Sequence, residues 1–242
     1  MRTALITGGS GGIGLACARL LVERGYQVVL TARRPGPLRR AAGEVGARWV
    51  AADSADPDAL AAAVEAARPL GLLVHAAGTM AGTFVTRETV EGFDAVLRAN
   101  LRSAFVAAHL AVPAMTAGSR MVFLSSSAAH APQPGKAAYS ASKAALNAFA
   151  AALAGEVDGA GISVHVVTPA PVATAMLDDV HFPMVPLAPA DVAAAIVWLD
   201  QLPPAVVLPE LQMRAVTRGP FAPEAYVPPA ARARGRTTLP GT

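Results

Sequence analysis

The chain of 242 residues contains one cysteine, Cys17, which excludes an internal disulfide bond. Aromatic residues are also scarce at 5%, and charged residues make up 15%, whereas 53% of the residues are hydrophobic. Alanine and valine must therefore supply most of the core. Such small side chains favour close packing of helices on a sheet.

Apolar runs long enough to cross a membrane are missing as well. A span needs about 18 or more apolar residues. The nearest approach, 95–115, is interrupted by Arg98, Asn100, Arg102 and His109. Glycines interrupt the chain from Gly8, soon after Leu5-Ile6, so we expect no secretory signal. These absences predict a soluble, cytoplasmic protein with no membrane partner.

The polar residues indicate neither a metal nor a nucleic acid. The five histidines, at positions 75, 109, 130, 165 and 181, show no paired spacing of the kind that binds zinc. The formal charge of +3 is mild, and the arginines are scattered until the tail. An anionic dinucleotide explains this excess as well as a nucleic acid does. We therefore expect no metal and no nucleic-acid partner.

A glycine-rich segment stands between a strand pattern and a helix pattern near the amino terminus. Residues 3–7 form a short apolar run, residues 8–14 read Gly-Gly-Ser-Gly-Gly-Ile-Gly, and an apolar helical pattern follows from Leu15. Glycines let the backbone approach a pyrophosphate, and the free N–H groups of a helix N-terminus face its charge. The segment predicts a dinucleotide site, although the glycines alone are also typical of a tight turn.

The residues after the next predicted strand, 27–32, indicate which dinucleotide binds. An NAD site usually carries an acidic residue about 20 residues beyond the glycines. Here the strand ends in Arg33 and Arg34, and no carboxylate occurs before Glu44. Guanidinium groups bind phosphate through paired donors. We therefore predict NADP(H) as the preferred cofactor and NAD(H) as the alternative; the other interpretation is that these arginines only solvate a helix start.

Tyr139 and Lys143 are four residues apart in an alanine-rich stretch that predicts a helix. Positions i and i+4 share one helix face, so the phenol and the ammonium are expected side by side. A free phenol has a pKa of about 10, and a nearby positive charge favours the phenolate. We expect this pair to exchange a proton near neutral pH. On a solvated helix the same spacing also occurs by chance.

Several segments in a single order make the chain resemble the short-chain dehydrogenase/reductase family. They are 7–14, His75-Ala-Ala-Gly78, Asn100, Ser126, Tyr139 with Lys143, and Pro169-Ala-Pro-Val-Ala-Thr174. The resemblance implies an α/β fold with a doubly wound parallel sheet, the three-layered α/β/α Rossmann fold. Apolar runs at 72–77, 121–124 and 164–168, separated by helical segments, favour the same fold on their own.

The resemblance implies chemical roles for four residues. Tyr139 would be the proton donor and acceptor, and Lys143 its electrostatic partner and a ligand of the nicotinamide ribose. Ser126 would polarise the substrate carbonyl, and Asn100 would hold a water in the proton relay. Strand alternation turns the serines at 125 and 127 away from the face that Ser126 uses, unless a bulge shifts the count.

The resemblance also implies a set of cofactor contacts. They are Gly8, Ser10, Gly12, Ile13, Gly14, Arg33, Arg34, Asp53, Ala76, Ala77, Gly78, Asn100, Tyr139, Lys143, Pro169, Val172 and Thr174. Two segments depart from the family pattern. Segment 75–78 replaces Asn-Asn-Ala-Gly, a variant that also resembles ketoreductase modules of polyketide synthases, and we expect altered packing on the adenosine side. Ala170 replaces a glycine, which requires a backbone conformation that alanine tolerates.

Composition changes once, near residue 219. Residues 1–218 are expected to form one dinucleotide-binding domain that includes the catalytic site. The tail 219–242 holds five prolines and resists core packing. We expect it to be disordered or, through Phe221 and Tyr226, packed on a neighbouring subunit. The apolar segment 175–186 is expected either to close over a substrate or to pack as a surface loop.

These features predict an NADP(H)-dependent ketoreductase or alcohol dehydrogenase that acts on a small carbonyl or alcohol. A sensor without chemistry is one alternative, but it has no need of the proton donor Tyr139. A sugar-nucleotide epimerase is another, but it normally brings a larger C-terminal region. The resemblance further implies a homodimer or homotetramer through the helices around Asn100 and after Tyr139, where alanines 144, 145, 148, 151 and 152 allow close approach.

Overall fold

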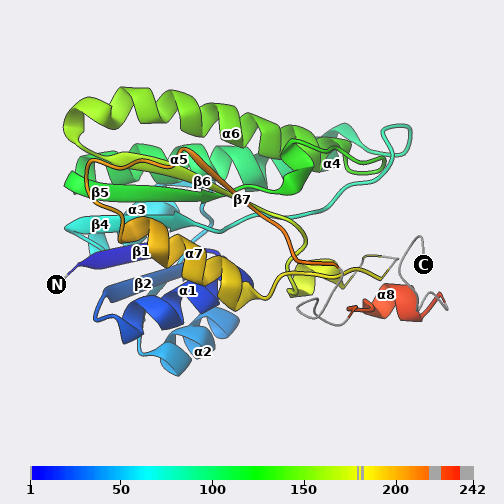
Figure 1. The fold of residues 1–242 in the computed structure, drawn as a ribbon, viewed down its shortest axis with the longest axis horizontal. Helices are drawn as coiled ribbons and strands as arrows, with labels where there is room; N and C mark the ends of the chain where they lie inside the picture. The colour runs from blue at the N-terminus through cyan, green and yellow to red at the C-terminus, as the bar shows by residue number, and fades with distance from the viewer. Residues whose placement is uncertain (1, 179, 181–182, 218–224, 235–242) are drawn as a thin grey trace.

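The structure, a computed structural model, describes residues 2–178, 180, 183–217 and 225–234. Within these residues, seven parallel strands form one sheet in the order β3-β2-β1-β4-β5-β6-β7. The strands are β1 (Thr3–Thr7), β2 (Gln27–Ala32), β3 (Arg48–Ala51), β4 (Leu70–His75), β5 (Met115–Leu124), β6 (Ser163–Pro169) and β7 (Glu210–Met213). Helices cover both faces of the sheet (Figure 1). The predicted doubly wound α/β fold is confirmed.

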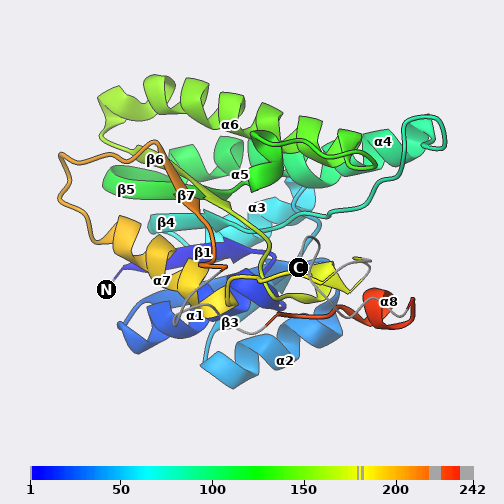
Figure 2. The same cartoon turned by 45° about the vertical axis from the view of Figure 1, so that its right-hand side comes forward.

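The helices divide between the two faces, as Figures 1 and 2 show. One face carries α1 (Gly12–Glu23), α2 (Pro35–Val45) and α7 (Pro189–Asp200). The other carries α3 (Pro57–Ala66), α5 (Ser103–Ala111) and α6 (Ala137–Val157), with α4 (Val90–Leu97) beside α6. A π-helical turn, η1 (Arg98–Arg102), joins α4 to α5. The short 3-10 turns are η2 (Val112–Ala114), η3 (Ser127–Ala129), η4 (Asp158–Ala160) and η5 (Ala175–Leu177).

Strand β1 shows why a sheet covered on both faces needs a continuous apolar run. All five of its residues are buried. Leu5 packs in the core beneath α5 and α6, whereas its neighbour Ile6 packs in the core beneath α1 and α7. Successive strand side chains point to opposite faces, so both must be apolar. Alanines such as Ala18 and Ala107 are fully buried between the larger side chains, as the composition predicts.

Some predicted strand bounds hold and others do not. The strands at 3–7 and 27–32 have those bounds in the structure. The run predicted at 72–77 ends at His75, where the ladder with β1 ends, and β5 begins at Met115 rather than at 121. The two edge strands, β3 and β7, carried no recognisable signal. Each has only four residues, none of them fully buried, and so lacks a clear apolar pattern.

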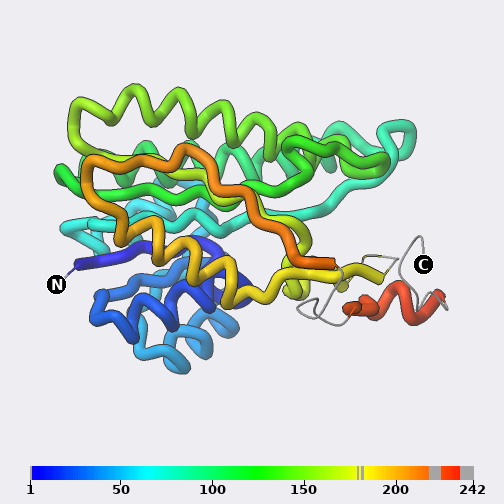
Figure 3. The backbone as a smooth tube through the Cα atoms, viewed as in Figure 1, coloured from blue at the N-terminus to red at the C-terminus, as the bar shows by residue number. Residues whose placement is uncertain are grey.

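The strand order changes direction between β1 and β4. The chain runs outward from β1 to β3 and then crosses back to β4, a path that Figure 3 follows from blue to cyan. Open parallel sheets bind ligands outside the carboxyl ends of their strands at such a switch point. The predicted site segments follow the carboxyl ends of five strands: 8–14 after β1, 33–34 after β2, 76–78 after β4, 125–126 after β5 and 170–174 after β6.

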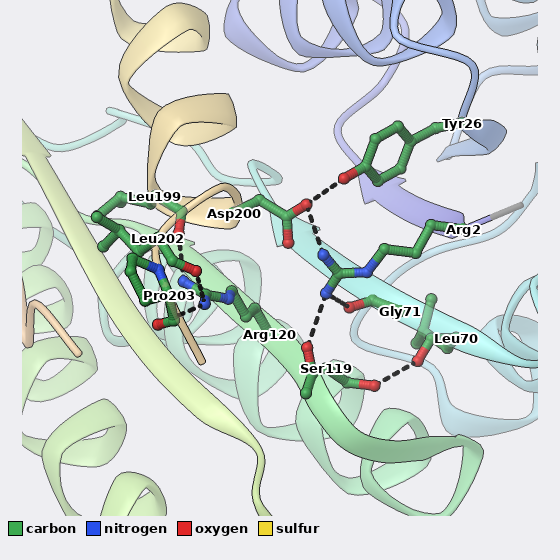
Figure 4. A network of polar contacts seen from close by, with 11 residues as sticks. Arg2, Tyr26, Leu70, Gly71, Ser119, Arg120, Leu199, Asp200, Leu202 and Pro203 are labelled. Carbon is green, nitrogen blue, oxygen red and sulfur yellow. Dashed lines mark hydrogen bonds and ion pairs between the residues drawn. The ribbon is translucent and has the colours of Figure 1, made fainter. Parts of the chain in front are cut away.

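A buried polar network holds the opposite, amino-terminal end of the sheet (Figure 4). Asp200, at the end of α7, is 4% exposed; it accepts hydrogen bonds from Arg2 Nη1 at 3.0 Å and from the Tyr26 hydroxyl. The Arg120 guanidinium, on β5, donates to the main-chain oxygens of Leu199, Leu202 and Pro203. The network therefore ties the end of α7 to the amino end of β1 and to the middle of β5.

The described part of the predicted tail, 225–234, packs on the segment that follows β6. Tyr226 and Met184 exchange two main-chain hydrogen bonds of 2.8 and 3.0 Å. The Ala230 N–H donates to the Asp178 carbonyl at 3.2 Å, and the Tyr226 hydroxyl donates to the Asp178 carboxylate at 3.3 Å. This part of the tail thus contacts its own chain.

The short helix α8 (Pro229–Arg232) lies within this part of the tail. Phe221 of the predicted tail contact, and His181 and Phe182 of the predicted lid, lie outside the described residues. In the described ranges no helix has the length and hydrophobicity of a membrane span. The same residues contain no group of three or more His, Cys, Asp or Glu side chains placed to hold a metal ion.

Candidate active site

The turn after β1 is built from glycines because it lies against the end of β4. Gly8 has a φ of +68°, and a Cβ there would lie 2.7 Å from the Ala76 main-chain oxygen. A Cβ on Gly14 would lie 2.5 Å from the Gly8 oxygen. Thr7 Oγ1 accepts a hydrogen bond from the Ala77 N–H at 3.2 Å. The predicted contact segments 8–14 and 76–77 therefore lie side by side.

The start of α1 fits an anionic group. It has no side-chain cap at Gly11 and no acidic residue in its first turn, so its first N–H groups lack partners within the helix. A Cβ on Gly11 would meet nothing within 4 Å, and one on Gly12 would meet the Thr174 side chain at 3.2 Å. Ser10 and Ile13, half-buried, border the same turn. The turn is an open set of donors, which the pyrophosphate of a dinucleotide fits.

Arg33 and Arg34 follow β2 and are exposed. Among the described residues, no carboxylate pairs with either guanidinium group. They lie next to the glycine turn, since the Gly9 N–H donates to the Thr31 main-chain oxygen at 3.1 Å. The Thr31 hydroxyl is buried and has no partner within the described structure. Two guanidinium groups without an acidic partner, next to the glycine turn that fits a pyrophosphate, can bind an additional phosphate.

Asp53, another predicted cofactor ligand, has protein partners on both carboxylate oxygens. Its Oδ1 accepts the Ala55 N–H at 3.0 Å, and its Oδ2 pairs with Arg98 at 3.0 Å. The carboxylate thereby ties the loop after β3 to the η1 turn. Its cofactor contact stays a prediction.

Ser126 begins the η3 turn just after β5. Its backbone is extended, and its Oγ accepts the Ala128 N–H at 3.2 Å. A hydrogen bond from its side chain also lowers the pKa of the Tyr139 phenol. Ser125 differs, because its hydroxyl is buried and points to the Lys143 main-chain oxygen at 3.4 Å. Of these serines, Ser126 is therefore the one next to the predicted proton donor.

Tyr139 and Lys143 lie in the first two turns of α6, on the helix that their spacing predicts. Tyr139 is 7% exposed and Lys143 5%. The Lys143 Nζ lies 5.9 Å from the centre of the Tyr139 ring and donates to the Leu124 main-chain oxygen at 2.6 Å. Burial lowers the pKa of Lys143 from 10.5 to about 8.

The pKa of Tyr139 differs from the sequence expectation. Burial raises this pKa above 10.0, and the hydrogen bond with Ser126 opposes that rise only in part. The expectation that Lys143 draws the phenol towards neutrality is wrong for this structure. The ammonium is directed at the Leu124 carbonyl, and desolvation of the phenolate is the larger effect. Tyr139 is therefore a protonated phenol at neutral pH.

Asn100 is fully buried in η1, the wider helical turn between α4 and α5. Its Nδ2 donates to the Thr79 main-chain oxygen at 3.0 Å and to Ser142 Oγ at 2.9 Å, and its Oδ1 accepts the Thr79 N–H at 2.7 Å. Ser142 Oγ in turn donates to the Tyr139 main-chain oxygen at 2.7 Å. The side chain thus joins the loop after β4 to the catalytic helix. Its two amide hydrogens are both used, so the predicted water contact stays a prediction.

His75 is a packed, neutral imidazole. It is 1% exposed, with Nδ1 3.0 Å from Thr7 Oγ1 and Nε2 3.1 Å from Ser103 Oγ. Burial, and secondly the charge of Lys143, lowers its pKa from 6.5 to about 3. The variant residue therefore fills space between β1, β4 and α5 and carries no charge near neutral pH.

The variant segment 75–78 also reaches the catalytic helix, beyond the adenosine side to which we assigned it. A Cβ on Gly78 would lie 2.9 Å from Asn100 Oδ1 and 3.7 Å from Lys143 Nζ. A larger residue there would displace the Asn100 amide. Gly78 thus belongs beside Asn100 and Lys143 in the site.

The segment after β6 holds the remaining predicted contacts. No described residue other than glycine has a positive φ, so Ala170 adopts a backbone that alanine tolerates; its N–H donates to the Met213 oxygen at 2.7 Å. Val172 is buried and forms a parallel bridge with Leu187. Thr174 meets the glycine turn, as described above. The segment therefore lies beside the glycine turn at the carboxyl end of the sheet.

Several contacts of the site escaped the sequence reasoning. Ser142 carried a signal, because it lies three residues after Tyr139 on the same helical face. Thr79 and Leu124 carried none, since both act through main-chain groups and any residue type supplies those.

The sheet order and the glycine turn define a dinucleotide-binding protein of the Rossmann type. Comparison with known families gives a narrower result. The family described as short chain dehydrogenase matches residues 2–182. The chain belongs to the short-chain dehydrogenase/reductase family of oxidoreductases, and the predicted family and enzyme class are confirmed.

Named relatives agree with this assignment. The chain is 35% identical to the 3-oxoacyl-[acyl-carrier-protein] reductase MabA of Mycobacterium tuberculosis, over 72% of this chain and 71% of the relative. A solved short chain dehydrogenase from Burkholderia cenocepacia, in complex with NADP, is 30% identical with a TM-score of 0.80, covering 88% of this chain and 96% of the other. A structure of BdcA in complex with NADPH is also 30% identical, with a TM-score of 0.77 and coverage of 88% and 93%.

Proposed function

We propose that the protein is an NADP(H)-dependent oxidoreductase that interconverts a ketone or aldehyde and the corresponding alcohol. The observation that carries the proposal is the group formed by the buried Tyr139 and Lys143 and the half-buried Ser126 at the carboxyl end of the sheet. A phenol that stays protonated at neutral pH, hydrogen-bonded to a serine and close to an ammonium, is equipped to donate a proton to an oxygen.

The cofactor assignment rests on two features of this chain. The uncapped start of α1 offers main-chain donors to a pyrophosphate, and Arg33 and Arg34 are available for a 2′-phosphate. The complexes of the two solved relatives with NADP and NADPH support the same choice. NAD(H), which lacks this phosphate, is the weaker cofactor in this proposal.

When bound, the nicotinamide cofactor supplies or accepts the hydride. In the direction of reduction, Tyr139 donates its proton to the substrate oxygen as negative charge develops there. Ser126 donates a hydrogen bond to the same oxygen. The Lys143 ammonium then stabilises the phenolate that remains. In oxidation the same groups act in reverse, with the tyrosine accepting the proton.

Asn100 positions this group through the contacts described above. By binding both Thr79 and Ser142, it fixes the loop after β4 against the helix that carries Tyr139. We propose that it also holds a water for the proton relay. Loss of the Asn100 side chain is expected to lower kcat, because proton transfer to Tyr139 would slow.

The assembly of the protein belongs to the proposal too. We propose a homodimer or homotetramer through α5 and α6, because Phe105 is 53% exposed and four of the five alanines predicted to line the contact are exposed. The cytoplasmic location and the small-molecule nature of the substrate stay predictions. A carbonyl on an acyl chain is the first substrate class to test, given the name of the mycobacterial relative.

The decisive experiment is oxidation of NADPH by the protein against a panel of ketones, quinones and 3-oxoacyl thioesters. Tyr139→Phe should reduce kcat by about a hundredfold or more, because it removes the proton donor, and should leave NADPH affinity nearly unchanged. Tyr26→Phe is the matched control, since its hydroxyl lies in the network at the other end of the sheet. Turnover by Tyr139→Phe above about a tenth of the wild-type rate would contradict the mechanism.

The same experiment separates the alternatives. A sensor would bind NADPH and consume none of it with any carbonyl in the panel. A sugar nucleotide added to the panel tests the epimerase, which would convert it with no net change in NADPH.

A further inference from the structure

His130 closes the single turn that Ser126 opens. Ser126 is the N-cap of η3 and His130 its C-cap, and the His130 N–H donates to the Ser127 oxygen at 3.1 Å. The residues that follow, 131–134, are exposed. The serine turn is therefore anchored on one side by β5 and continues on the other into a surface loop.

The His130 side chain reaches the edge strand. Its Nε2 lies 2.6 Å from Glu210 Oε1, at the start of β7. Thr168, on β6, donates its hydroxyl to the same Oε1 at 2.6 Å. Burial alone would raise the pKa of Glu210, but the hydrogen bonds from Thr168 and His130 lower it overall. Glu210 is therefore an ionised acceptor shared by β6 and the serine turn.

The catalytic helix α6 also contacts His130. Tyr139, Lys143 and Asn147 are spaced by four residues along α6, so they lie on neighbouring turns of one face. The Asn147 Nδ2 lies 3.4 Å from His130 Nε2. The contact between His130 and Glu210 thus stands where the serine turn, the catalytic helix and the edge strand come together.

We infer that His130 and Glu210 are positioning residues that hold Ser126 against Tyr139. The inference rests on the proposed function, because the serine and tyrosine matter only if they act on a common substrate oxygen. Neither His130 nor Glu210 lies among the predicted cofactor contacts. They act through the serine turn, whose one-turn length leaves it free to shift once this lateral contact is lost.

Global stability is not the role of this contact. The two side chains are 45% and 30% exposed, and ion pairs at such exposure contribute little to the free energy of unfolding. The reaction rate is more sensitive than stability to a small displacement, because misplacing a reacting group by about 1 Å can cost up to a hundredfold in rate. A contact that hardly affects stability can therefore matter for turnover.

The first test measures kcat, KM and thermal midpoint for His130→Ala, Glu210→Ala and the double variant. Each single variant should lower kcat about tenfold, with the affinity for NADPH and the thermal midpoint close to wild type. The double variant should be no slower than the slower single variant, because both substitutions break the contact between His130 and Glu210. Glu210→Gln keeps an acceptor oxygen and should restore most of kcat. Glu65→Ala, which removes the carboxylate of an exposed ion pair on α3, is the matched control.

Two kinetic outcomes would overturn the inference. One is a kcat for Glu210→Ala within about twofold of wild type, because the inferred displacement of Ser126 should cost about tenfold. The other is a double variant whose loss equals the product of the single losses, since independent effects multiply in this way.

A second measurement does not depend on activity. The chain has three tyrosines, at 26, 139 and 226, so tyrosine labelled with ¹³C at Cζ gives three resonances that Tyr→Phe variants assign. In Glu210→Ala the Tyr139 resonance should move towards its position in Ser126→Ala, and in Glu65→Ala it should stay. An unmoved resonance in Glu210→Ala would overturn the inference. If the wild type reduces no carbonyl, the proposed function fails, while this resonance still tests the contact.

Discussion

Replacing Lys143 with methionine should stabilise the cofactor-free protein while removing its activity. The ammonium is 5% exposed, and its pKa is lowered from 10.5 to about 8. One pKa unit corresponds to about 1.4 kcal/mol, so holding this charge in the fold costs about 3 kcal/mol at neutral pH. Methionine fills a similar volume and carries no charge.

One interaction opposes that gain. The substitution removes the 2.6 Å hydrogen bond from Nζ to the Leu124 oxygen, and leaving a buried carbonyl without this donor costs about 1 kcal/mol. The expected net gain at pH 7 is therefore about 2 kcal/mol. Desolvation of the ammonium is the larger of the two effects, so the sign favours the variant.

The pH dependence provides a sharper check. Between pH 8 and 10.5 the folded state binds fewer protons at Lys143 than the unfolded state does, so the wild type gains stability as pH rises. The advantage of Lys143→Met is fully present below pH 8 and should shrink by about 2 kcal/mol between pH 7 and 9.5.

The assay is urea unfolding followed by circular dichroism at matched protein concentration, without cofactor. Lys136→Met is the matched control, since Lys136 is the other lysine of the chain and is less buried. With two lysines, ¹³C labelling at Cε also reports the pKa of Lys143 directly. A Lys143→Met variant that is less stable than wild type at pH 7, or whose advantage is independent of pH, would refute the reasoning.

Two further predictions concern the cofactor and the amino-terminal network. Arg33→Ala/Arg34→Ala should weaken NADPH binding about a hundredfold. A hydrogen bond to a charged group contributes about 1.5 to 3 kcal/mol, and because both arginines are exposed, each contribution lies at the lower end of this range. NADH binding should hardly change; fluorescence titration at fixed ionic strength measures both, and equal wild-type affinity for the two cofactors would contradict the assignment. Asp200→Ala should cost about 3 kcal/mol in urea unfolding, because it leaves Tyr26 and Arg2 without their shared acceptor. NADPH affinity should be retained, and a cost below about 0.5 kcal/mol would show that the partly exposed Arg2 finds water instead.

What the sequence predicts well here is whatever depends on neighbours along the chain. The run 3–7 has a strand pattern because both of its faces are buried, and the glycines that follow have the freedom that a tight approach to Ala76 demands. Tyr139 and Lys143 share a face because they are four residues apart on a helix. Each of these properties is local, so a short window of residues contains it.

Contacts between distant segments could not be predicted in the same way. His130 and Glu210 are 80 residues apart, and Asn100 and Ser142 are 42 apart. Glu210 lies on a four-residue edge strand that has no apolar periodicity, so nothing marked it as a partner of the serine turn. Such pairs follow from the register of β6 with β7 and from the packing of α6, which only the folded chain defines.

The sign of the Tyr139 pKa shift belongs to this second kind of property. Spacing along the helix places an ammonium near the phenol, and that alone argues for a lowered pKa. The fold adds burial, which disfavours the phenolate, and in the resting protein burial prevails. Low polarity also strengthens the attraction between opposite charges. The burial that raises the pKa of Tyr139 before the reaction thus also increases the stabilisation that Lys143 gives to the phenolate once the proton has left.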